Sequence, residues 1–300
     1  TDSGGATFGG AVTLSGTLTL TDTDDADDII FNGAVTAATL TTQNPAYDLT
    51  FNAGGTITND TNILSTGILT IGNDANDSMT FTGGFDSGGT GAMNLAGTLA
   101  TTNQALNIDR VTTLTANSVI DSGSGAITID GTINGNYTLA LNGSAGVTSI
   151  DAVIGGGTAI NTLTTEAGGS TSINANITSN GTQTYNDTVD IEGGTRTLTS
   201  NGGAIFFDGT VDSLGATNRG LTVNAGSGLT TFDAVVGNTN DLGAIIISGS
   251  GGLDLDAAIG IRAGNSGATS LAVTGASNLG ADVNTSSTQV YTGAVTLDSG

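Results

Sequence analysis

The chain has 300 residues, including 49 glycines but no cysteine or histidine, and its formal charge at pH 7 is −23. Its four basic residues are scattered arginines, so it lacks the clustered Lys and Arg that nucleic acids and anionic membrane surfaces require. The absence of cysteine excludes disulfides and thiolate metal sites. No apolar run approaches the ~18 residues of a membrane helix. We therefore expect neither nucleic-acid binding nor membrane insertion of this segment.

Short apolar–polar–apolar segments follow one another along the chain, which is the period-2 pattern of strands with one buried face. Between them lie Asn-Gly, Gly-Gly and Asp-Ser-Gly sequences, which tolerate the positive φ of tight turns. No window of useful length has apolar residues at helical spacing. The predicted strands are Val12–Leu14, Leu18–Leu20, Ile29–Phe31, Leu49–Phe51, Ile68–Ile71, Met79–Phe81, Ile127–Ile129, Leu139–Leu141, Val189–Ile191, Ile205–Phe207, Leu221–Val223, Leu253–Leu255 and Leu271–Val273.

Several of these segments are copies of one another. GTQTYNDTVDI at residues 181–191 returns as STQVYTGAVTL at residues 287–297, so that Gln183 matches Gln289 and Tyr185 matches Tyr291. A weaker copy, ATFGGAVTL, occupies residues 6–14 with Phe8 in the tyrosine position. The offsets between these and other copies lie near multiples of about 25 residues, which is typical of a solenoid that gains or loses whole coils.

The repeats predict an all-β fold, a right-handed parallel β-helix of roughly twelve coils of about 25 residues each. We expect one continuous solenoid over residues 1–300, excised from a longer repeat protein. Outward asparagines at turns are expected to stack as amide ladders, for example Asn142 and Asn224. The side chains expected to point into the coil are Leu18, Leu20, Ile127, Ile129, Ile205 and Phe207.

Two acidic segments are candidate calcium sites, because dense carboxylate and amide oxygens in a loop are what Ca²⁺ prefers. Neither has the spacing of an EF-hand loop or of the glycine-rich nonapeptide calcium repeat. A solvated acidic turn that discourages edge pairing is the alternative. TDTDDADD contains Asp22, Asp24, Asp25, Asp27 and Asp28, and GNDANDS, expected at the equivalent place two coils later, contains Asn73, Asp74, Asn76 and Asp77.

No residue set in the sequence resembles a catalytic centre. Nucleophilic catalysis by Ser or Cys usually needs a neighbouring His, which the chain lacks. A pair of aspartates could imitate a glycosidase dyad, but the aromatic platforms that bind sugars are scarce at 4% aromatic content. We therefore expect no enzymatic activity, and a carbohydrate-active β-helix is the remaining enzymatic alternative.

The TQTYNDTVDI, GGAIFFDGTVDS, LTVNAGSG and TFDAVVG segments resemble the repeats of giant bacterial surface exoproteins, the filamentous-haemagglutinin-like and autotransporter-passenger adhesins. The resemblance implies a secreted, cell-surface β-helical stalk that acts in adhesion, biofilm matrix or filament formation. Its expected partners are a host or cell-surface receptor, or further copies of itself in end-to-end or lateral contact. The alternative function is a self-assembling matrix filament or surface-layer subunit, with or without calcium as cofactor.

Overall fold

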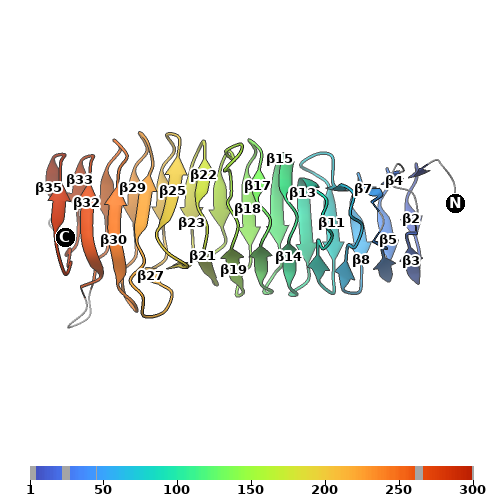
Figure 1. The fold of residues 1–300 in the computed structure, drawn as a ribbon, viewed down its shortest axis with the longest axis horizontal. Coiled ribbons are helices and arrows are strands. Elements are labelled where there is room, and N and C mark those ends of the chain that lie inside the picture. Colours follow the sequence, from blue (N-terminus) through green and yellow to red (C-terminus); the bar gives the residue numbers. More distant parts are fainter. Residues whose placement is uncertain (1–4, 22–27, 45, 261–265, 299–300) are drawn as a thin grey trace. The chain divides into compact units, whose positions relative to one another are not determined.

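The computed structural model describes residues 5–21, 28–44, 46–260 and 266–298, and within them it contains strands but no helix. The chain is a parallel β-solenoid of about 13 turns, as the repeats predict. It divides into two compact units, residues 1–148 and residues 149–300. In each unit, successive coils lay equivalent strands side by side (Figure 1).

Unit 1 builds each coil from three short strands, and every ladder between coils is parallel. The β1 sheet contains β1 (Ala6–Phe8), β4 (Asp28–Phe31), β7 (Asp48–Phe51), β10 (Leu69–Ile71), the first parts of β13 (Met93–Thr101) and β15 (Thr112–Asp121), and β17 (Ile133–Asn134). The β2 sheet contains β2 (Val12–Thr13), β5 (Val35–Ala37), β8 (Gly55–Ile57), β11 (Ser78–Phe81), the second parts of β13 and β15, and β18 (Leu139–Asn142).

The third side of unit 1 consists of two ladders. The first pairs β3 (Thr17–Thr19) with β6 (Thr39–Thr41). The second contains β9 (Thr61–Asn62), β12 (Phe85–Asp86), β14 (Leu106–Ile108) and β16 (Ile127–Ile129). Strand β19 (Val147–Ile150) spans the boundary between the units.

Unit 2 has the same three-sided plan. The β22 sheet contains β22 (Ile177–Ser179), β25 (Arg196–Ser200), β28 (Leu221–Asn224), β30 (Leu242–Ile247), β32 (Ala268–Val273) and β34 (Gln289–Tyr291). The β23 sheet contains β20 (Leu163–Thr165), β23 (Gln183–Tyr185), β26 (Ile205–Phe207), β29 (Thr230–Phe232), β31 (Leu253–Leu255), β33 (Ser277–Leu279) and β35 (Val295–Leu297). The β24 sheet contains β21 (Ser170–Ile173), β24 (Thr188–Ile191) and β27 (Val211–Ser213), and single bridges at Val236, Ile259 and Val283 continue it.

The coils are shorter than the predicted 25 residues. In unit 1 the register runs through Phe8, Phe31, Phe51, Ile71, Leu95 and Leu114. In unit 2 five coils carry the register from Tyr185 to Leu297, or about 22 residues each, within the range of solenoid repeats.

The strongest sequence repeat does not mark a whole number of coils. Gln183–Tyr185 lies in the β23 sheet, whereas its copy Gln289–Tyr291 pairs with β32 in the β22 sheet. The reason is that each corner needs the same local sequence: a strand with inward apolar residues, a polar turn and another strand. The copies therefore match corners, and reading every offset as whole coils was wrong.

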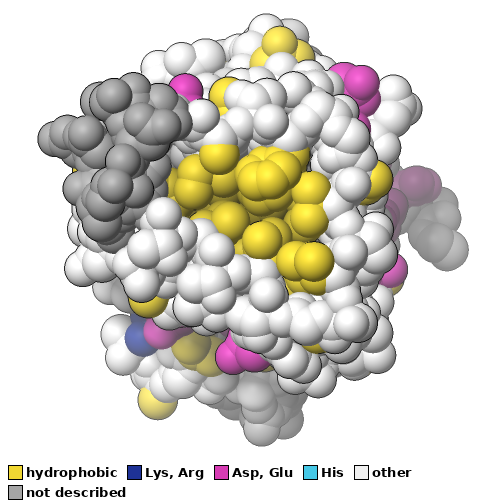
Figure 2. All heavy atoms as spheres, turned by 90° about the vertical axis from the view of Figure 1, so that its right-hand side faces the viewer, with side chains coloured by type: hydrophobic (Ala, Val, Ile, Leu, Met, Phe, Trp, Pro, Cys, Tyr) yellow, Lys and Arg dark blue, Asp and Glu magenta, His cyan; other side chains and the backbone are white. Residues whose placement is uncertain are grey.

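The interior is a set of columns of stacked side chains. Phe31 stacks on Phe8 at 4.7 Å and on Phe51 at 5.4 Å between ring centroids, and Phe207 stacks between Tyr185 and Phe232 at 5.2 and 4.8 Å. Seen from the β1–β3 end, hydrophobic side chains gather in the centre of the coil (Figure 2). Of the predicted inward residues, Leu20, Ile127, Ile129, Ile205 and Phe207 are buried, and Leu18 is half-buried.

Amide ladders are present, but at other asparagines than those predicted. Asn52 Nδ2 donates to Asn32 Oδ1 at 2.8 Å, and Asn201 Nδ2 donates to Asn180 Oδ1 at 2.9 Å. Asn224 instead accepts a hydrogen bond from the Gly226 N–H within its own turn. A ladder requires asparagine at the same place in two adjacent coils, and Asn142 has Asp121 as its neighbour in register.

Candidate functional site

The first acidic segment lies almost entirely outside the described residues. Asp22, Asp24, Asp25 and Asp27 fall in the undescribed stretch 22–27. Asp28 begins β4, is exposed, and stands in register with Asp48 of the next coil.

The second acidic segment forms a turn between β10 and β11 whose carboxylates bind its own backbone. Asp77 Oδ2 accepts hydrogen bonds from the N–H of Asn73 at 2.8 Å and of Asp74 at 3.0 Å. Asp74 Oδ1 accepts one from the Asn76 N–H at 2.7 Å. The carboxylates of Asp74 and Asp77 therefore stabilise a polar turn between strands by accepting hydrogen bonds from the backbone of the other candidate ligands.

The two segments do not occupy equivalent places, contrary to the expectation from the sequence. Ile29 pairs with Leu49 and Leu49 with Leu69, so the first segment precedes this strand while the second follows it. Within the described ranges, no group of three or more His, Cys, Asp or Glu side chains is arranged to hold a metal ion. Calcium binding by the complete set of nine residues stays a prediction.

Arg110 is a buried arginine that the sequence did not predict as a functional residue. The Arg110 side chain is 2% exposed, follows β14, and its guanidinium lies inside unit 1. Its Nε donates at 2.6 Å to the carbonyl of Ser87 and at 3.0 Å to that of Gly88, and its Nη1 donates at 2.8 Å to Gly67. Its Nη2 donates to the carbonyls of Ile63 and Ser65.

These five carbonyls belong to the corners that follow β9 and β12, so Arg110 ties together three successive coils. Gly89, at φ +52°, leaves room for the guanidinium, because a Cβ there would lie 2.2 Å from Arg110 Nη2. Burial lowers the pKa of Arg110. The fork of guanidinium donors suits this binding of several carbonyls, and we call this group the Arg110 clamp. The clamp has one sequence signal, an arginine that follows a strand, together with a Gly-Gly pair in the preceding coil.

Carboxylates stack on one another at two corners. In unit 1, partial desolvation, a side-chain hydrogen bond to Asp86 and the charges of Asp86 and Asp130 raise the pKa of Asp109 to about 6. In unit 2, desolvation and the neighbouring charge of Asp208 raise the pKa of Asp233. Like charges close together disfavour full ionisation, so these ladders are groups whose charge depends on pH.

Asp187 is a buried carboxylate of unit 2. It accepts hydrogen bonds from the hydroxyls of Thr165 at 3.1 Å and Thr171 at 2.9 Å. Desolvation raises its pKa although these hydrogen bonds favour the ionised form. Its partners come from β20 and β21 of the preceding coil, so the contact holds two coils together.

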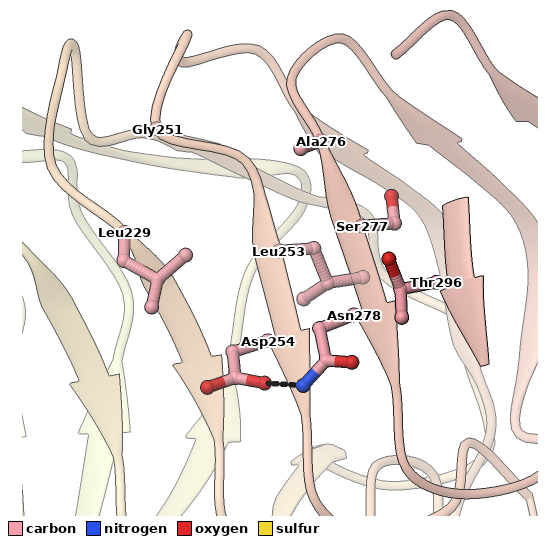
Figure 3. Close-up of a pocket in the computed structure, with 8 residues that line it drawn as sticks. All are labelled: Leu229, Gly251, Leu253, Asp254, Ala276, Ser277, Asn278 and Thr296. Carbon is pink, nitrogen blue, oxygen red and sulfur yellow. Dashed lines mark hydrogen bonds between the residues drawn. The ribbon is translucent and has the colours of Figure 1, made fainter. Parts of the chain in front are cut away.

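Two shallow hollows among the described residues are candidates for a small-ligand site. The hollow in unit 2 encloses about 190 Å³ on the outside of β31 and β33 (Figure 3). Asp254 accepts a hydrogen bond from Asn278 Nδ2 at 3.0 Å there, and it is the only carboxylate among the eight lining residues.

The hollow in unit 1 has two carboxylates, those of Asp60 and Asp86, beside Gln104 and Asn107. Its one aromatic residue, Phe85, is 1% exposed and points into the coil. Asp86 already accepts a hydrogen bond from the Gly88 N–H at 2.7 Å. Neither hollow presents an exposed aromatic platform of the kind that sugars stack on.

The chain has no match among protein-family models, curated proteins or solved structures. Among the described residues, no helix has the length and hydrophobicity of a membrane-spanning segment. None of these comparisons tests the resemblance to bacterial surface exoproteins, which stays a prediction from the repeat sequences.

Proposed function

We propose that this chain is a non-enzymatic structural segment, a stalk or fibre of a secreted bacterial surface protein that acts in adhesion or matrix formation. The observation that supports it is the use of polar side chains, buried at Arg110 and Asp187, to bind the coil above or below. The Arg110 clamp spans three coils, Asp187 binds threonines of the preceding coil, and asparagines stack from coil to coil. A chain whose polar groups hold neighbouring coils together is suited to carrying load along the stack.

The surface chemistry agrees with this proposal. The outward positions carry mainly Thr, Asn and Asp, and the net charge of −23 favours solubility and disfavours unspecific lateral association. The absence of lysine leaves trypsin-like proteases only four arginines, and one of them, Arg110, is buried. Such a surface fits a protein exposed outside the cell.

Single-molecule pulling between the two termini tests the mechanical part of the proposal. We expect coils to detach one after another, with contour-length steps of roughly 75 Å at ~3.4 Å per residue for a 22-residue coil. The three coils that the Arg110 clamp joins should detach together and give one longer contour-length step. Unfolding of the whole chain in one event, or without measurable resistance, would contradict a load-bearing role.

Location requires a separate measurement. An antibody raised against the purified chain should label intact, unpermeabilised cells of the organism that makes it, and trypsin treatment of those cells should leave the label. Labelling that appears only after permeabilisation would remove the surface assignment while leaving the mechanical result unchanged.

A further inference from the structure

Asparagine followed by glycine is the dipeptide in which an amide side chain most readily closes on the backbone. Glycine has no Cβ, so nothing on the second residue hinders the approach of its nitrogen to the side-chain carbonyl carbon. Each such pair is a candidate for spontaneous deamidation, and the fold decides which of them reacts. The pairs of this chain begin at Asn32, Asn134, Asn142, Asn180 and Asn201.

Most of these pairs are restrained by hydrogen bonds. Asn32 Oδ1 accepts one from Asn52 Nδ2 at 2.8 Å, and Asn201 Nδ2 donates one to Asn180 Oδ1 at 2.9 Å. The Gly181 N–H, whose nitrogen would attack Asn180, donates at 2.6 Å to a carbonyl of the preceding coil. Ring closure at these positions must therefore first break an amide ladder or a backbone hydrogen bond.

Asn142 lacks such restraints. It is the half-buried last residue of β18, and the turn begins at Gly143. Among the described residues, neither the side-chain amide of Asn142 nor the Gly143 N–H has a hydrogen-bond partner. In the preceding coil the side chain in register, Asp121, accepts a hydrogen bond from the Gly123 N–H at 2.8 Å. The attacking nitrogen and the amide it attacks are thus both free at Asn142.

We propose that Asn142 is a site of spontaneous deamidation whose product weakens the contact between β15 and β18. The Gly143 nitrogen loses its proton to hydroxide and bonds to Asn142 Cγ, while the bond from Cγ to the amide nitrogen breaks and ammonia leaves. Water then opens the succinimide ring at either carbonyl and leaves aspartate or isoaspartate at position 142. The peptide group has to turn for this closure, so the 2.9 Å hydrogen bond from the Ser122 N–H to the Asn142 carbonyl opens first.

The product places two carboxylates in adjacent coils. Asn142 stands in register with Asp121, and neighbouring strands lie about 4.8 Å apart. Like charges directly opposite each other disfavour ionisation and destabilise the strand pair. Isoaspartate also inserts Cβ into the main chain and so lengthens the backbone at the end of β18. Because the reaction is irreversible, the contact between these coils weakens with the age of the protein.

Peptide mapping by mass spectrometry tests the site in the full folded chain, incubated in heavy-oxygen water at pH 8 and at pH 5. At pH 8 we expect labelled aspartate and isoaspartate at position 142, at least about five times as much as at Asn32, Asn180 or Asn201, the factor that one hydrogen bond contributes. At pH 5 the label should fall, because hydroxide is scarce. In a chain kept unfolded by urea the pairs should react at similar rates.

Two results would overturn the site. One is a folded chain in which Asn142 reacts no faster than Asn32 and Asn201. The other is an unfolded chain that keeps the preference for Asn142, because the fold would then not be its cause. Asn142→Gln should remain unlabelled at this position, since its longer side chain would have to close a larger and less favourable ring.

The effect on stability is measured without incubation. Asn142→Asp should lower the melting temperature at pH 8, whereas Asn218→Asp, which adds the same charge at an exposed loop residue, should leave it unchanged. The exchange variant Asp121→Asn with Asn142→Asp again has one carboxylate between the two coils and should melt as the wild type does. Far-ultraviolet circular dichroism checks that each variant is folded. An equal loss in Asn218→Asp, or an exchange variant no more stable than Asn142→Asp, would contradict the weakened contact.

Discussion

The Tyr185 hydroxyl donates a hydrogen bond to Gln183 Oε1 at 2.9 Å, and both side chains are fully buried between coils. Gln183 Nε2 donates in turn to Ser179 Oγ at 3.0 Å and to the Thr199 carbonyl at 2.8 Å. The same Gln-x-Tyr pair recurs at Gln289 and Tyr291 on a different sheet, where Gln289 is exposed and Tyr291 half-buried. The motif thus forms the same hydrogen bond in two surroundings, one buried and one exposed to solvent.

Replacing the buried tyrosine should therefore cost more than replacing the exposed one. Tyr185→Phe leaves Gln183 Oε1 without its donor, and we expect a loss of about 1–3 kcal/mol in the free energy of unfolding. Tyr291→Phe should cost no more than about 0.5 kcal/mol, because water replaces the lost partner. Chemical denaturation of both variants measures the difference. Equal losses in the free energy of unfolding would mean that the buried hydrogen bond from Tyr185 to Gln183 contributes no more than its exposed counterpart.

The Arg110 clamp should be the most sensitive polar group of unit 1. Arg110→Met keeps an apolar stem but leaves five carbonyls without this donor, and we expect a loss of at least about 3 kcal/mol. Arg110→Lys should not restore stability, because one ammonium cannot span three coils as the guanidinium fork does. Thermal unfolding and hydrogen exchange of residues 61–110 provide the measurement.

The control for the clamp is Arg219→Met. Among the described residues, the Arg219 guanidinium binds only the carbonyls of Leu214 and Thr217 in its own loop, so we expect a change within about 0.5 kcal/mol. An Arg110→Lys variant as stable as the wild type would show that positive charge alone, without the fork of guanidinium donors, explains the role of Arg110.

The acidic ladder of unit 1 should make stability depend on pH in an unusual direction. The pKa of Asp109 in the folded chain is raised to about 6, above its ordinary value of 3.8. The folded state therefore binds a proton more tightly than the unfolded state, and stability rises as pH falls from 7 through 6 towards 4. Melting temperatures between pH 5 and pH 8 should show this rise.

Asp109→Asn should raise the melting temperature at pH 8 and flatten its dependence on pH, since the amide carries no charge to desolvate. Asp282→Asn removes one exposed carboxylate elsewhere and should leave the slope unchanged. If both variants flatten the curve equally, the general charge of −23 is responsible and the ladder is not.

The turn at residues 73–77 should need its aspartate whether or not calcium is present. Asp77→Ala removes the acceptor of two backbone N–H groups, and we expect a loss of about 1–2 kcal/mol. Thermal melting in calcium and in chelator measures it, with Asn76→Ala, whose side chain leaves the two bonds to Asp77 intact, as control. A loss confined to calcium-containing buffer would assign the carboxylate to the metal and confirm the predicted site.

The sequence by itself determined the class of this protein. Alternation of apolar and polar residues between glycine and asparagine turns gives short strands with one buried face, and repeated copies of such units give a solenoid. Ile127, Ile129, Ile205 and Phe207 could be placed inside on this pattern alone. These features can be read from local sequence. Successive side chains of a strand point to opposite faces, so the alternation of apolar and polar residues indicates which side chains point inward.

Only the tertiary structure decided which residues meet between coils. Gln183 and Gln289 read as the same place in a repeat, yet they lie on different sheets, because the lengths of the intervening turns add up along the chain. The Arg110 clamp likewise depends on carbonyls 22 to 47 residues earlier. Backbone carbonyls carry no sequence signal, and three corners of a coil use the same turn chemistry. Which residues meet between coils therefore depends on the total length of each coil, and no local sequence pattern encodes that length.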